Sequence, residues 1–394
     1  MAPKNLSLHN IAYFLVIALI GTLILIEGKF FIIPFFFAIL LSVIVLPIQH
    51  FYDRFIKTHA LSTILTFFTI LLPLTAIVGF FSFQVSNVLS NLSNISGRLQ
   101  QGTDNLFIWL SQYFHISVED SQNFLKENIS GIVASPISVI QSTFSSFGII
   151  LLNIVLIILF MFFMLSYRIA LKNFMLMQFE PMQRSGVAAV MVEIQKMLRQ
   201  YLNGLLSVMI ILAVLNSLGL WIIGVEYPIL WASLAAFLTI IPYIGTTLGG
   251  GLPFFYALAT AESWQQPAAV ILMYVTVQQI EGNLITPYVV GSRVRINPLI
   301  AIIAILLMNE LWGVSGIVLA IPIAATIKII FDRIAPLKAV GTLMSSNIIK
   351  DQDKFLSEYN ESHFRFSSLL LRRNKEKEDI AKADNNTESD KPIQ

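Results

Sequence analysis

Two long apolar segments, each interrupted by Pro and Gly at a comparable place, constrain this chain more than any other feature. The first runs from 228 to 259 and contains Pro242-Tyr243-Ile244-Gly245, and the second runs from 298 to 333 and contains Trp312-Gly313-Val314-Ser315-Gly316. About 20 apolar residues are enough to cross a bilayer. Backbone groups freed inside such a segment must be covered by protein or face a water-filled cavity, because lipid cannot hydrogen-bond to them. The sequence therefore predicts an integral membrane protein whose broken helices line a path for a solute.

The composition agrees with a membrane protein and excludes several other classes. Of the 394 residues, 56% are hydrophobic and 12% are charged, whereas soluble domains carry about 25% charged residues. The chain has no Cys, which excludes disulfides, thiol catalysis and Cys-ligated metals. The net charge of +2 is small and the basic residues are scattered, so we expect no binding to nucleic acid.

The apolar runs predict an all-α protein with about eight transmembrane helices. The predicted spans are 10–27, 30–51, 61–84, 139–167, 203–224, 228–259, 267–288 and 298–333. The last of these could instead be a hairpin of two half-helices that turns between Asn309 and Ser315. The first is interpreted as a membrane helix and not as a signal peptide, because no small-x-small cleavage site follows it.

These spans divide the chain into four regions. Residues 1–84 hold the first three helices. Residues 85–138 have helical apolar periodicity and form a predicted extracytoplasmic insertion. Residues 139–338 hold the remaining five helices together with an amphipathic, cytoplasmic helix at 180–202. Residues 339–394 form a cytoplasmic tail, which the dense mixed charge after about Arg373 predicts to be largely disordered.

The positions of Lys and Arg predict the orientation. Basic residues gather after the second, fourth and last spans, which lie on one side of the membrane if there are eight crossings: Arg54, Lys57, Arg168, Lys172, Arg184, Lys196, Arg199, Lys328, Arg333 and Lys338. Because cytoplasmic loops are enriched in Lys and Arg, both termini are expected in the cytoplasm.

No enzymatic constellation is present in the sequence. It contains neither a Gly-x-x-x-x-Gly-Lys-Ser/Thr phosphate loop nor a Gly-x-Ser-x-Gly nucleophile motif. Its five His residues lie far apart, without a His-x-x-x-His pair. We therefore expect no enzyme, no cofactor and no metal site, which leaves transport driven by an ion or solute gradient.

Polar residues inside predicted spans are the best candidates for a functional site, because desolvating them is costly. The strongest cluster is Gln278-Gln279-Ile280-Glu281-Gly282-Asn283, just before Thr286-Pro287. A helix places Gln279 and Asn283 on one face and Gln278 with Glu281 on another. The alternative is that Glu281 only ends the helix at the membrane surface and makes one salt bridge there.

A second candidate is Glu310, which precedes Trp312-Gly313. In a helix that crosses the whole membrane, Glu310 lies near mid-depth and needs a partner such as Arg293 or Arg295; in a hairpin it lies at a turn beside water. On the span at 203–224, Asn203 and Asn216 either line a path or join two helices by hydrogen bonds.

Gly and Pro residues predict where the helices break. Gly245 and Gly249 either allow close helix packing or let backbone carbonyls face a solute. Because Pro242 and Pro253 lie on either side of these glycines, we expect the helix to unwind locally there. We therefore place Pro242, Gly245 and Gly249 on the predicted solute pathway. Further breaks are expected at the remaining positions of this kind: Pro253, Pro287, Gly313, Gly316 and Pro322.

The same residues carry a family resemblance. The chain resembles the autoinducer-2 exporter family, or PerM-like permeases, in these motifs: Ile241-Pro242-Tyr243-Ile244-Gly245, Gln279-Ile280-Glu281-Gly282-Asn283 with Thr286-Pro287, Gly291, Asn297-Pro298, Leu311-Trp312-Gly313, Gly316 and Ala320-Ile321-Pro322. The resemblance implies an eight-span protein of the bacterial inner membrane that assembles as a homo-oligomer, a pentamer. It implies export of a small polar signal in some members and sodium (or lithium)/proton antiport in others.

Three functions follow as hypotheses. The leading one is a secondary transporter or exporter of a small polar, autoinducer-2-like solute. The second is antiport of a monovalent cation against a proton, because a carboxyl group removed from water binds its proton more tightly and can exchange it. The third is a membrane scaffold that transports nothing and holds partners with residues 85–138. In all three the chain contacts membrane lipid.

Overall fold

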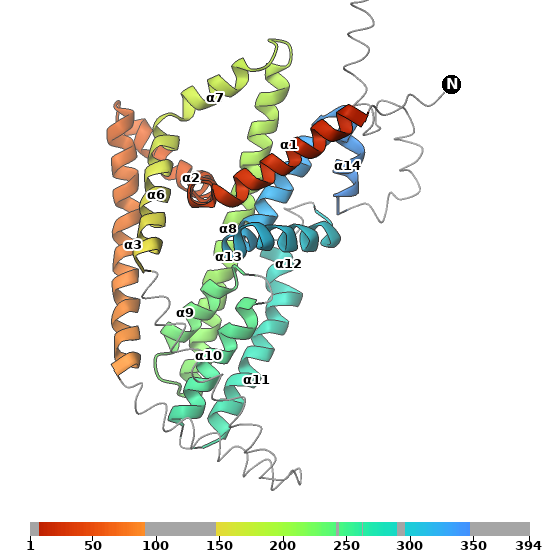
Figure 1. Ribbon diagram of the computed structural model, residues 1–394. Coiled ribbons are helices and arrows are strands. Elements are labelled where there is room, and N and C mark those ends of the chain that lie inside the picture. The colour runs from red at the N-terminus through yellow and green to blue at the C-terminus, as the bar shows by residue number, and fades with distance from the viewer. Residues whose placement is uncertain (1–7, 91–146, 242–243, 262, 290–295, 347–394) are drawn as a thin grey trace, which may run out of the picture. The chain divides into compact units, whose positions relative to one another are not determined.

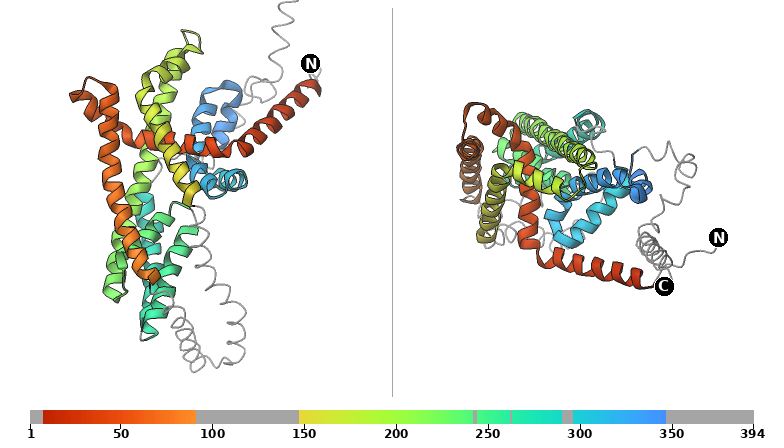
Figure 2. Two further views of the ribbon diagram at one scale, coloured as in Figure 1. Left: turned by 60° about the vertical axis from the view of Figure 1, so that its left-hand side comes forward. Right: turned by 90° about the horizontal axis from the view of Figure 1, so that it is seen from above.

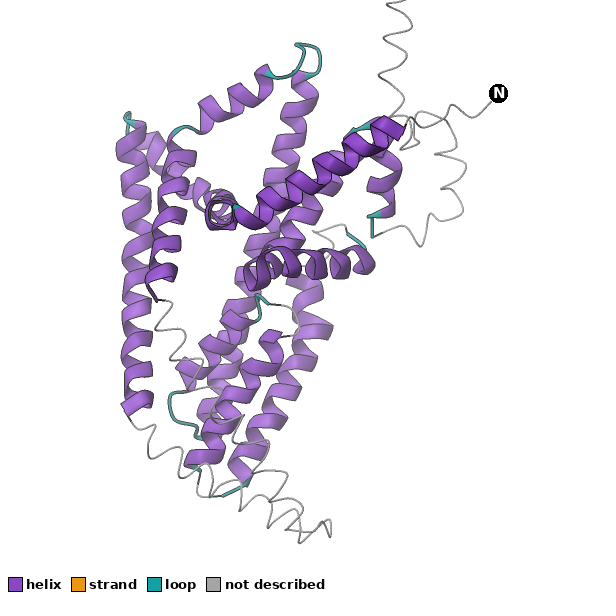
Figure 3. Ribbon diagram, in the orientation of Figure 1, coloured by secondary structure: helices purple, strands orange, loops and turns teal. Residues whose placement is uncertain are grey.

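The computed structural model describes residues 8–90, 147–241, 244–261, 263–289 and 296–346, and these residues are almost entirely helical (Figure 3). Extended pairing within these ranges is limited to one antiparallel bridge between Ile296 and Ser345. The predicted insertion at 85–138 lies outside the described residues beyond Ser90. The predicted tail lies outside them beyond residue 346.

The helices follow one another along the chain as labelled in Figure 1. Their bounds are α1 Leu8–Glu27, α2 Lys29–Phe55, α3 His59–Ser90, α6 Phe147–Ser166, α7 Arg168–Met177, α8 Arg184–Ile223, α9 Pro228–Leu238, α10 Ile244–Thr260, α11 Gln265–Ile280, the π-helix η1 Glu281–Ile285, α12 Thr286–Val289, α13 Pro298–Arg333, the 3₁₀-helix η3 Ala335–Leu337 and α14 Lys338–Leu343.

Several of these helices are long and apolar enough to cross a membrane. Five qualify among the described residues: α2, α3, α8, the run from α11 to α12, and α13. The bent pair α6 and α7 raises the number to six if the pair counts as one span. The prediction of a helical protein with several membrane-spanning helices is thus confirmed. The number of eight spans stays a prediction.

The chain forms two compact units. One contains residues 1–33, 176–196 and 294–394, and the other contains residues 34–175 and 197–293. The second unit holds most of α8 together with α9, α10 and α11.

In this second unit, α10 packs between α9 and α11 (Figure 1). The core around these helices consists of small and branched side chains: Val88, Leu220, Val225, Leu230, Ala232, Tyr256, Ala257 and Val270. A separate cluster joins α3 to α6, which run side by side in both Figure 1 and Figure 2. Burial of apolar side chains, added to backbone hydrogen bonding within each helix, stabilises this arrangement.

Helix α8 differs from the prediction. The sequence suggests an amphipathic helix at 180–202 and a separate span at 203–224, but the structure shows one continuous helix from Arg184 to Ile223. No Pro interrupts this stretch, so the backbone ladder continues although the polarity changes. The helix ends where Gly224 and Tyr227 take positive φ angles of 84° and 55°. The chain then turns back into α9.

Among its described residues, the first broken segment is interrupted between α9 and α10. Helix α9 ends at Leu238 and α10 begins at Ile244, and Pro242 lies outside the described residues. Contrary to the expected unwinding, α10 is helical through Gly245, Gly249 and Pro253. The glycines allow close packing instead, because a Cβ atom at position 249 would lie 2.9 Å from the Cβ of Ala235 in α9.

The second broken segment, α13, bends at Gly313, where φ is 59° and ψ is −138°. Two helical arms, Pro298–Trp312 and Val314–Arg333, meet at this residue (Figure 1). Gly316 and Pro322 lie within the second arm, are buried and keep helical geometry. A sharp turn at Gly313 is the geometry that the hairpin alternative requires, because 36 helical residues would otherwise extend about 54 Å.

Candidate functional site

A small polar pocket lies among α8, α9, α10 and α11 in the second unit. Its volume is about 260 Å³, including the part open to its surroundings. The lining comes from four helices and the first residue of η1: Leu212, Asn216, Ala235, Thr239, Gly245, Gly249, Tyr274, Val277, Gln278 and Glu281. Four of the predicted pathway residues are therefore brought together at one place, namely Gly245, Gly249, Gln278 and Glu281.

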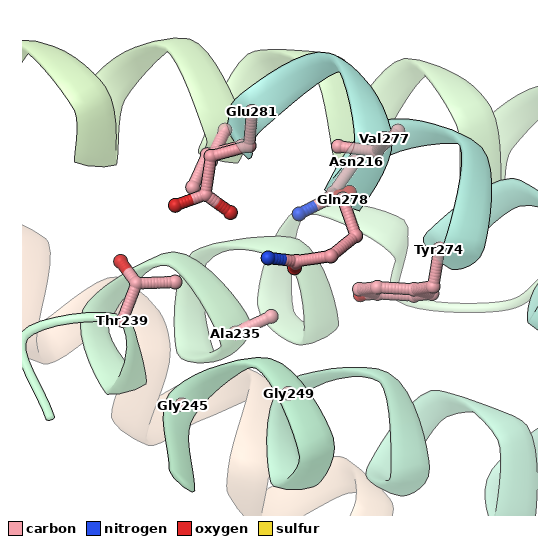
Figure 4. A pocket seen from close by; sticks show the side chains of 10 residues that line it. Asn216, Ala235, Thr239, Gly245, Gly249, Tyr274, Val277, Gln278 and Glu281 are labelled. Atoms are coloured by element: carbon pink, nitrogen blue, oxygen red, sulfur yellow. The ribbon is translucent and has the colours of Figure 1, made fainter. Parts of the chain in front are cut away.

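Polar side chains converge on this pocket from three directions (Figure 4). The side chains of Gln278 and Glu281 reach in from α11 and η1, that of Asn216 from α8, and Thr239 lies opposite at the end of α9. The amide group of Gln278 hydrogen-bonds to the carboxyl group of Glu281. The hydroxyl group of Thr239 donates to the carbonyl oxygen of Ala236 at 2.6 Å, so its lone pairs can still accept a hydrogen bond.

The missing side chains of two glycines shape the pocket. At Gly249 the backbone of α10 lies directly against Ala235, and at Gly250 an added Cβ atom would lie 3.1 Å from the ring of Tyr274. Glycine at these positions lets α10 approach α9 and α11 closely while the space above Gly249 stays open (Figure 4). The break at 239–243 ends α9 so that Thr239 faces this space.

Two oxygen atoms of pocket residues have no hydrogen-bond partner among the described residues. They are Oδ1 of Asn216, whose residue is 4% exposed, and the hydroxyl oxygen of Tyr274. Buried polar atoms are paired in the great majority of cases, so each unpaired one needs an explanation. Both residues belong to the pocket lining, although the two oxygen atoms themselves are closed off from water in this conformation.

The polar cluster of α11 divides between two faces, as the helical spacing predicts. Gln278 and Glu281 line the pocket. Gln279 and Asn283 are not among the lining residues, and Nδ2 of Asn283 donates to the carbonyl oxygen and to Oε1 of Gln279 at 2.9 and 3.2 Å. Pro287 follows in α12, and the turn before it is a π-helix, Glu281–Ile285. Single π-turns inside α-helices are frequent at functional sites.

The other predicted site residues lie elsewhere. Glu310 is exposed on the first arm of α13, within the first unit. Pro242, Arg293 and Arg295 lie outside the described residues. Metal binding has no support in the part of the chain that the structure describes, since no group of three or more His, Asp or Glu residues gathers there.

Of the polar residues that line the pocket, the sequence patterns did not point to Tyr274 and Thr239, and they left the role of Asn216 open. Tyr274 precedes Gln278 by four residues and Glu281 by seven, so the three form a stripe on one helical face, and this signal was available. Thr239 and Asn216 carry no such signal. Their place in the pocket depends on how α8 and α9 pack against α11.

Apolar helices long enough to span a bilayer, a broken span and a polar pocket beside the break together define a multi-pass membrane transport protein. The chain belongs to the AI-2E transporter family, whose family model matches residues 13–335. The predicted resemblance is thus confirmed.

Named relatives agree with this assignment. YueF of Bacillus subtilis, a presumed transport protein, is 25% identical over 283 residues, which cover 69% of this chain and 75% of YueF. The AI-2 transport protein TqsA of Escherichia coli is 20% identical over 316 residues, covering 80% of this chain and 89% of TqsA. YrrI of Bacillus subtilis, also a presumed transport protein, is 29% identical, but the match covers only 37% of this chain and 41% of YrrI.

Proposed function

We propose that this protein is a secondary transporter that exports a small polar solute across the bacterial inner membrane. The pocket among α8, α9, α10 and α11 is the proposed solute site. The observation that carries the proposal is the convergence of Glu281, Gln278 and Asn216 on a space kept open by Gly249, directly beside the break after α9. The family that the chain belongs to is one of transporters.

The chemistry of the pocket favours a solute that donates hydrogen bonds. Acceptor oxygens predominate, namely the carboxylate of Glu281, the hydroxyl oxygen of Thr239 and the unpaired Oδ1 of Asn216. A solute with several hydroxyl groups would satisfy them together. The pocket is small even when the part open to its surroundings is included, which favours a small solute. Because TqsA is named for AI-2 transport, autoinducer-2 is the first solute to test.

The remaining features of the proposal come from the sequence. The absence of a phosphate-binding loop favours transport down a gradient over transport driven by ATP hydrolysis in this chain. The distribution of Lys and Arg supports cytoplasmic termini. Assembly as a homo-oligomer, with the pentamer as the expected form, completes the proposal.

Efflux from proteoliposomes loaded with autoinducer-2 tests the site. Glu281→Gln and Gln278→Ala should each slow efflux about tenfold or more, because a lost hydrogen bond to a charged group is worth about 1.5–3 kcal/mol. Gln279→Ala and Asn283→Ala are the matched controls in the same stretch of helix, since both side chains lie outside the pocket lining and bond to each other. The site is wrong if the two pairs of variants behave alike.

Two further measurements separate this proposal from the other hypotheses. Antiport predicts that sodium added to inverted vesicles releases protons, as reported by a pH-sensitive dye, and that Glu281→Gln abolishes the signal. A scaffold predicts that a second protein copurifies in a fixed ratio and that the pure protein moves no solute. Efflux of autoinducer-2 without a sodium-dependent proton signal would support the exporter and exclude both alternatives.

A further inference from the structure

Helix α7 leaves the end of α6 at a sharp angle. The axes of α6 and α7 are bent by 71° at Tyr167, the single residue between them (Figure 1). With ten residues, α7 is about 15 Å long, which is half the apolar thickness of a bilayer. It is therefore too short to cross a bilayer by itself, and it turns away from the direction of α6.

The sequence of α7 is two-sided. Arg168 and Lys172 share one side of the helix at spacing i, i+4, and the opposite side holds Ala170, Phe174 and Met177. No residue of α7 is buried by the described part of the chain. Phe174 and Met177 are 62% and 68% exposed. A short helix of this kind, apolar on one side and basic on the other, is typical of segments that lie in a membrane interface.

The bend before α7 is fixed by hydrogen bonds. Nη1 of Arg168 donates to the carbonyl oxygen of Leu165 at 2.9 Å, and Nη2 forms an ion pair with Oδ2 of Asp53. Oδ1 of Asp53 also accepts from Oγ of Ser62 at 2.8 Å and from Nε2 of Gln49 at 3.1 Å. One carboxylate thus joins the end of α2, the start of α3 and the junction of α6 with α7.

These contacts determine the level at which α7 lies. Helices α2 and α3 are both candidate spans, and only residues 56–58 separate them. Such a short turn between two spans lies at the membrane surface, because its backbone groups need water. Asp53 ties Arg168 to this turn, so α7 starts at the same surface. Tyr167 at this junction is 57% exposed, and tyrosine is enriched at the interface between membrane and water.

We propose that α7 is an interfacial helix that binds the phospholipid surface, with its apolar side among the upper acyl chains and Lys172 at the headgroup phosphates. A phospholipid surface suits both sides of the helix. The apolar side chains face the acyl chains, and the basic side chain faces the anionic headgroups. This inference is independent of which solute is transported.

Nitroxide labels on single cysteines test the inference, and the absence of native Cys leaves no background. Ala170→Cys and Met175→Cys, both at exposed positions, place labels on the apolar and the basic side of α7 in the protein reconstituted into nanodiscs that contain phosphatidylglycerol. Collisions with oxygen report the acyl region, and collisions with a water-soluble nickel chelate report the aqueous phase. Leu159→Cys on α6, at a position that is 46% exposed, provides the standard for a lipid-facing site.

The label at 170 should favour oxygen as strongly as the label at 159, and the label at 175 should favour nickel. Nickel collisions at 170 equal to those at 175 would overturn the proposal, because α7 would then lie in water. Suppression of both kinds of collision at 170 would overturn it too, since a second copy of the chain would then cover the helix.

The role of Lys172 is tested by charge reversal. Each basic residue near an anionic surface strengthens binding about fivefold. In the background of the label at 170, Lys172→Glu should therefore lower the ratio of oxygen to nickel collisions several-fold in phosphatidylglycerol nanodiscs and much less in phosphatidylcholine nanodiscs. Lys196→Glu, an exposed site on α8, controls for the change in net charge. An equal response to both variants, or to Lys172→Glu in both lipids, would contradict the assigned contact.

Discussion

Gly249 of α10 lies against Ala235 of α9 so closely that a Cβ atom at position 249 would approach the Cβ of Ala235 to 2.9 Å. Real Cβ atoms do not come so near, so a side chain at 249 must push the two helices apart or enter the pocket. Gly251, two residues later in the same helix, has nothing within 4 Å of an added Cβ atom. The two glycines therefore form a natural test of whether close packing of α9 and α10 maintains the pocket.

Gly249→Val should destabilise the protein and slow transport, because overpacking a tight contact costs about 1–3 kcal/mol. Gly251→Val makes the same chemical change where space is open, and it should leave both properties nearly unaltered. Thermal unfolding in detergent and efflux normalised to inserted protein are the two measurements. Equal effects of the two substitutions would show that the contact with Ala235 does not control the pocket.

Replacing Asn216 by an apolar residue should have opposite effects on stability and on transport. Its Oδ1 atom is buried without a hydrogen-bond partner in the described ranges, and an unsatisfied buried polar atom costs about 1–3 kcal/mol. Asn216→Leu should therefore raise the unfolding free energy and at the same time slow efflux, since the solute loses an acceptor. Asn203→Leu, at an exposed position of the same helix, should change neither quantity much. A destabilised Asn216→Leu protein would mean that Oδ1 has a protein partner.

Tyr274→Phe applies the same test to the second unpaired atom. The hydroxyl oxygen of Tyr274 is buried without a partner in the part of the chain described, so its removal should leave stability unchanged or slightly higher. Efflux should fall if this hydroxyl group contacts the solute. Tyr288→Phe, on the highly exposed side of α12, is the matched control, and its tyrosine is 82% exposed. Unchanged efflux in Tyr274→Phe would remove this residue from the proposed site.

The local pattern of apolar and polar residues in the sequence predicted most of what the structure shows about individual helices. Apolar runs marked α2, α3, α6 and α13, because each must be long enough to cross a bilayer. Helical spacing separated Gln278 and Glu281 from Gln279 and Asn283, and the structure separates them in the same way.

Other features depend on packing and left no clear local signal. The glycines of α10 carry no information about which helix they approach, so close packing on Ala235 could not be distinguished from unwinding. The polarity of the chain changes near residue 202, but α8 continues because a helix needs backbone hydrogen bonds and not a uniform polarity. Asn216 and Thr239 enter the site through the packing of α8 and α9 against α11.

The ion pair between Asp53 and Arg168 should contribute far more to stability than the pair between Glu193 and Arg333. Asp53 and Arg168 are 15% and 21% exposed, whereas Glu193 and Arg333 are 49% and 57% exposed. Removing one partner of a buried pair costs about 3–5 kcal/mol and exposed pairs are worth about 0–1 kcal/mol. We expect Asp53→Ala to lie near the lower end of the first range, because the pair is only partly buried.

A double-mutant cycle measures this difference. Asp53→Ala, Arg168→Ala and the double variant should show a coupling energy well above that of the equivalent cycle at Glu193 and Arg333. Asp53→Ala should also free α7, so a spin label at 170 should become more mobile in that variant. Equal coupling energies in the two cycles would show that the carboxylate of Asp53 does not hold the three helix ends together.

Any side chain at position 313 should lower the stability of the protein. The φ of 59° and ψ of −138° at Gly313 lie in a region that residues with a Cβ atom rarely adopt. Gly313→Ala should cost about 1–3 kcal/mol of stability. Gly186→Ala in α8 makes the same change at a helical position with nothing within 4 Å, and it should stabilise by about 0.5–1 kcal/mol. Equilibrium unfolding in mixed detergent micelles measures the change in stability for both substitutions.

The turn at Gly313 is also tied to α1, since Nε1 of Trp312 donates to the carbonyl oxygen of Leu25 at 2.8 Å. Trp312→Phe keeps an aromatic ring but removes this donor, and it should cost about 1 kcal/mol. If α13 is straight in the working protein, Gly313→Ala will instead be neutral or stabilising, since Ala is the better helix former. The sign of that one substitution therefore decides between a hairpin and a single continuous span.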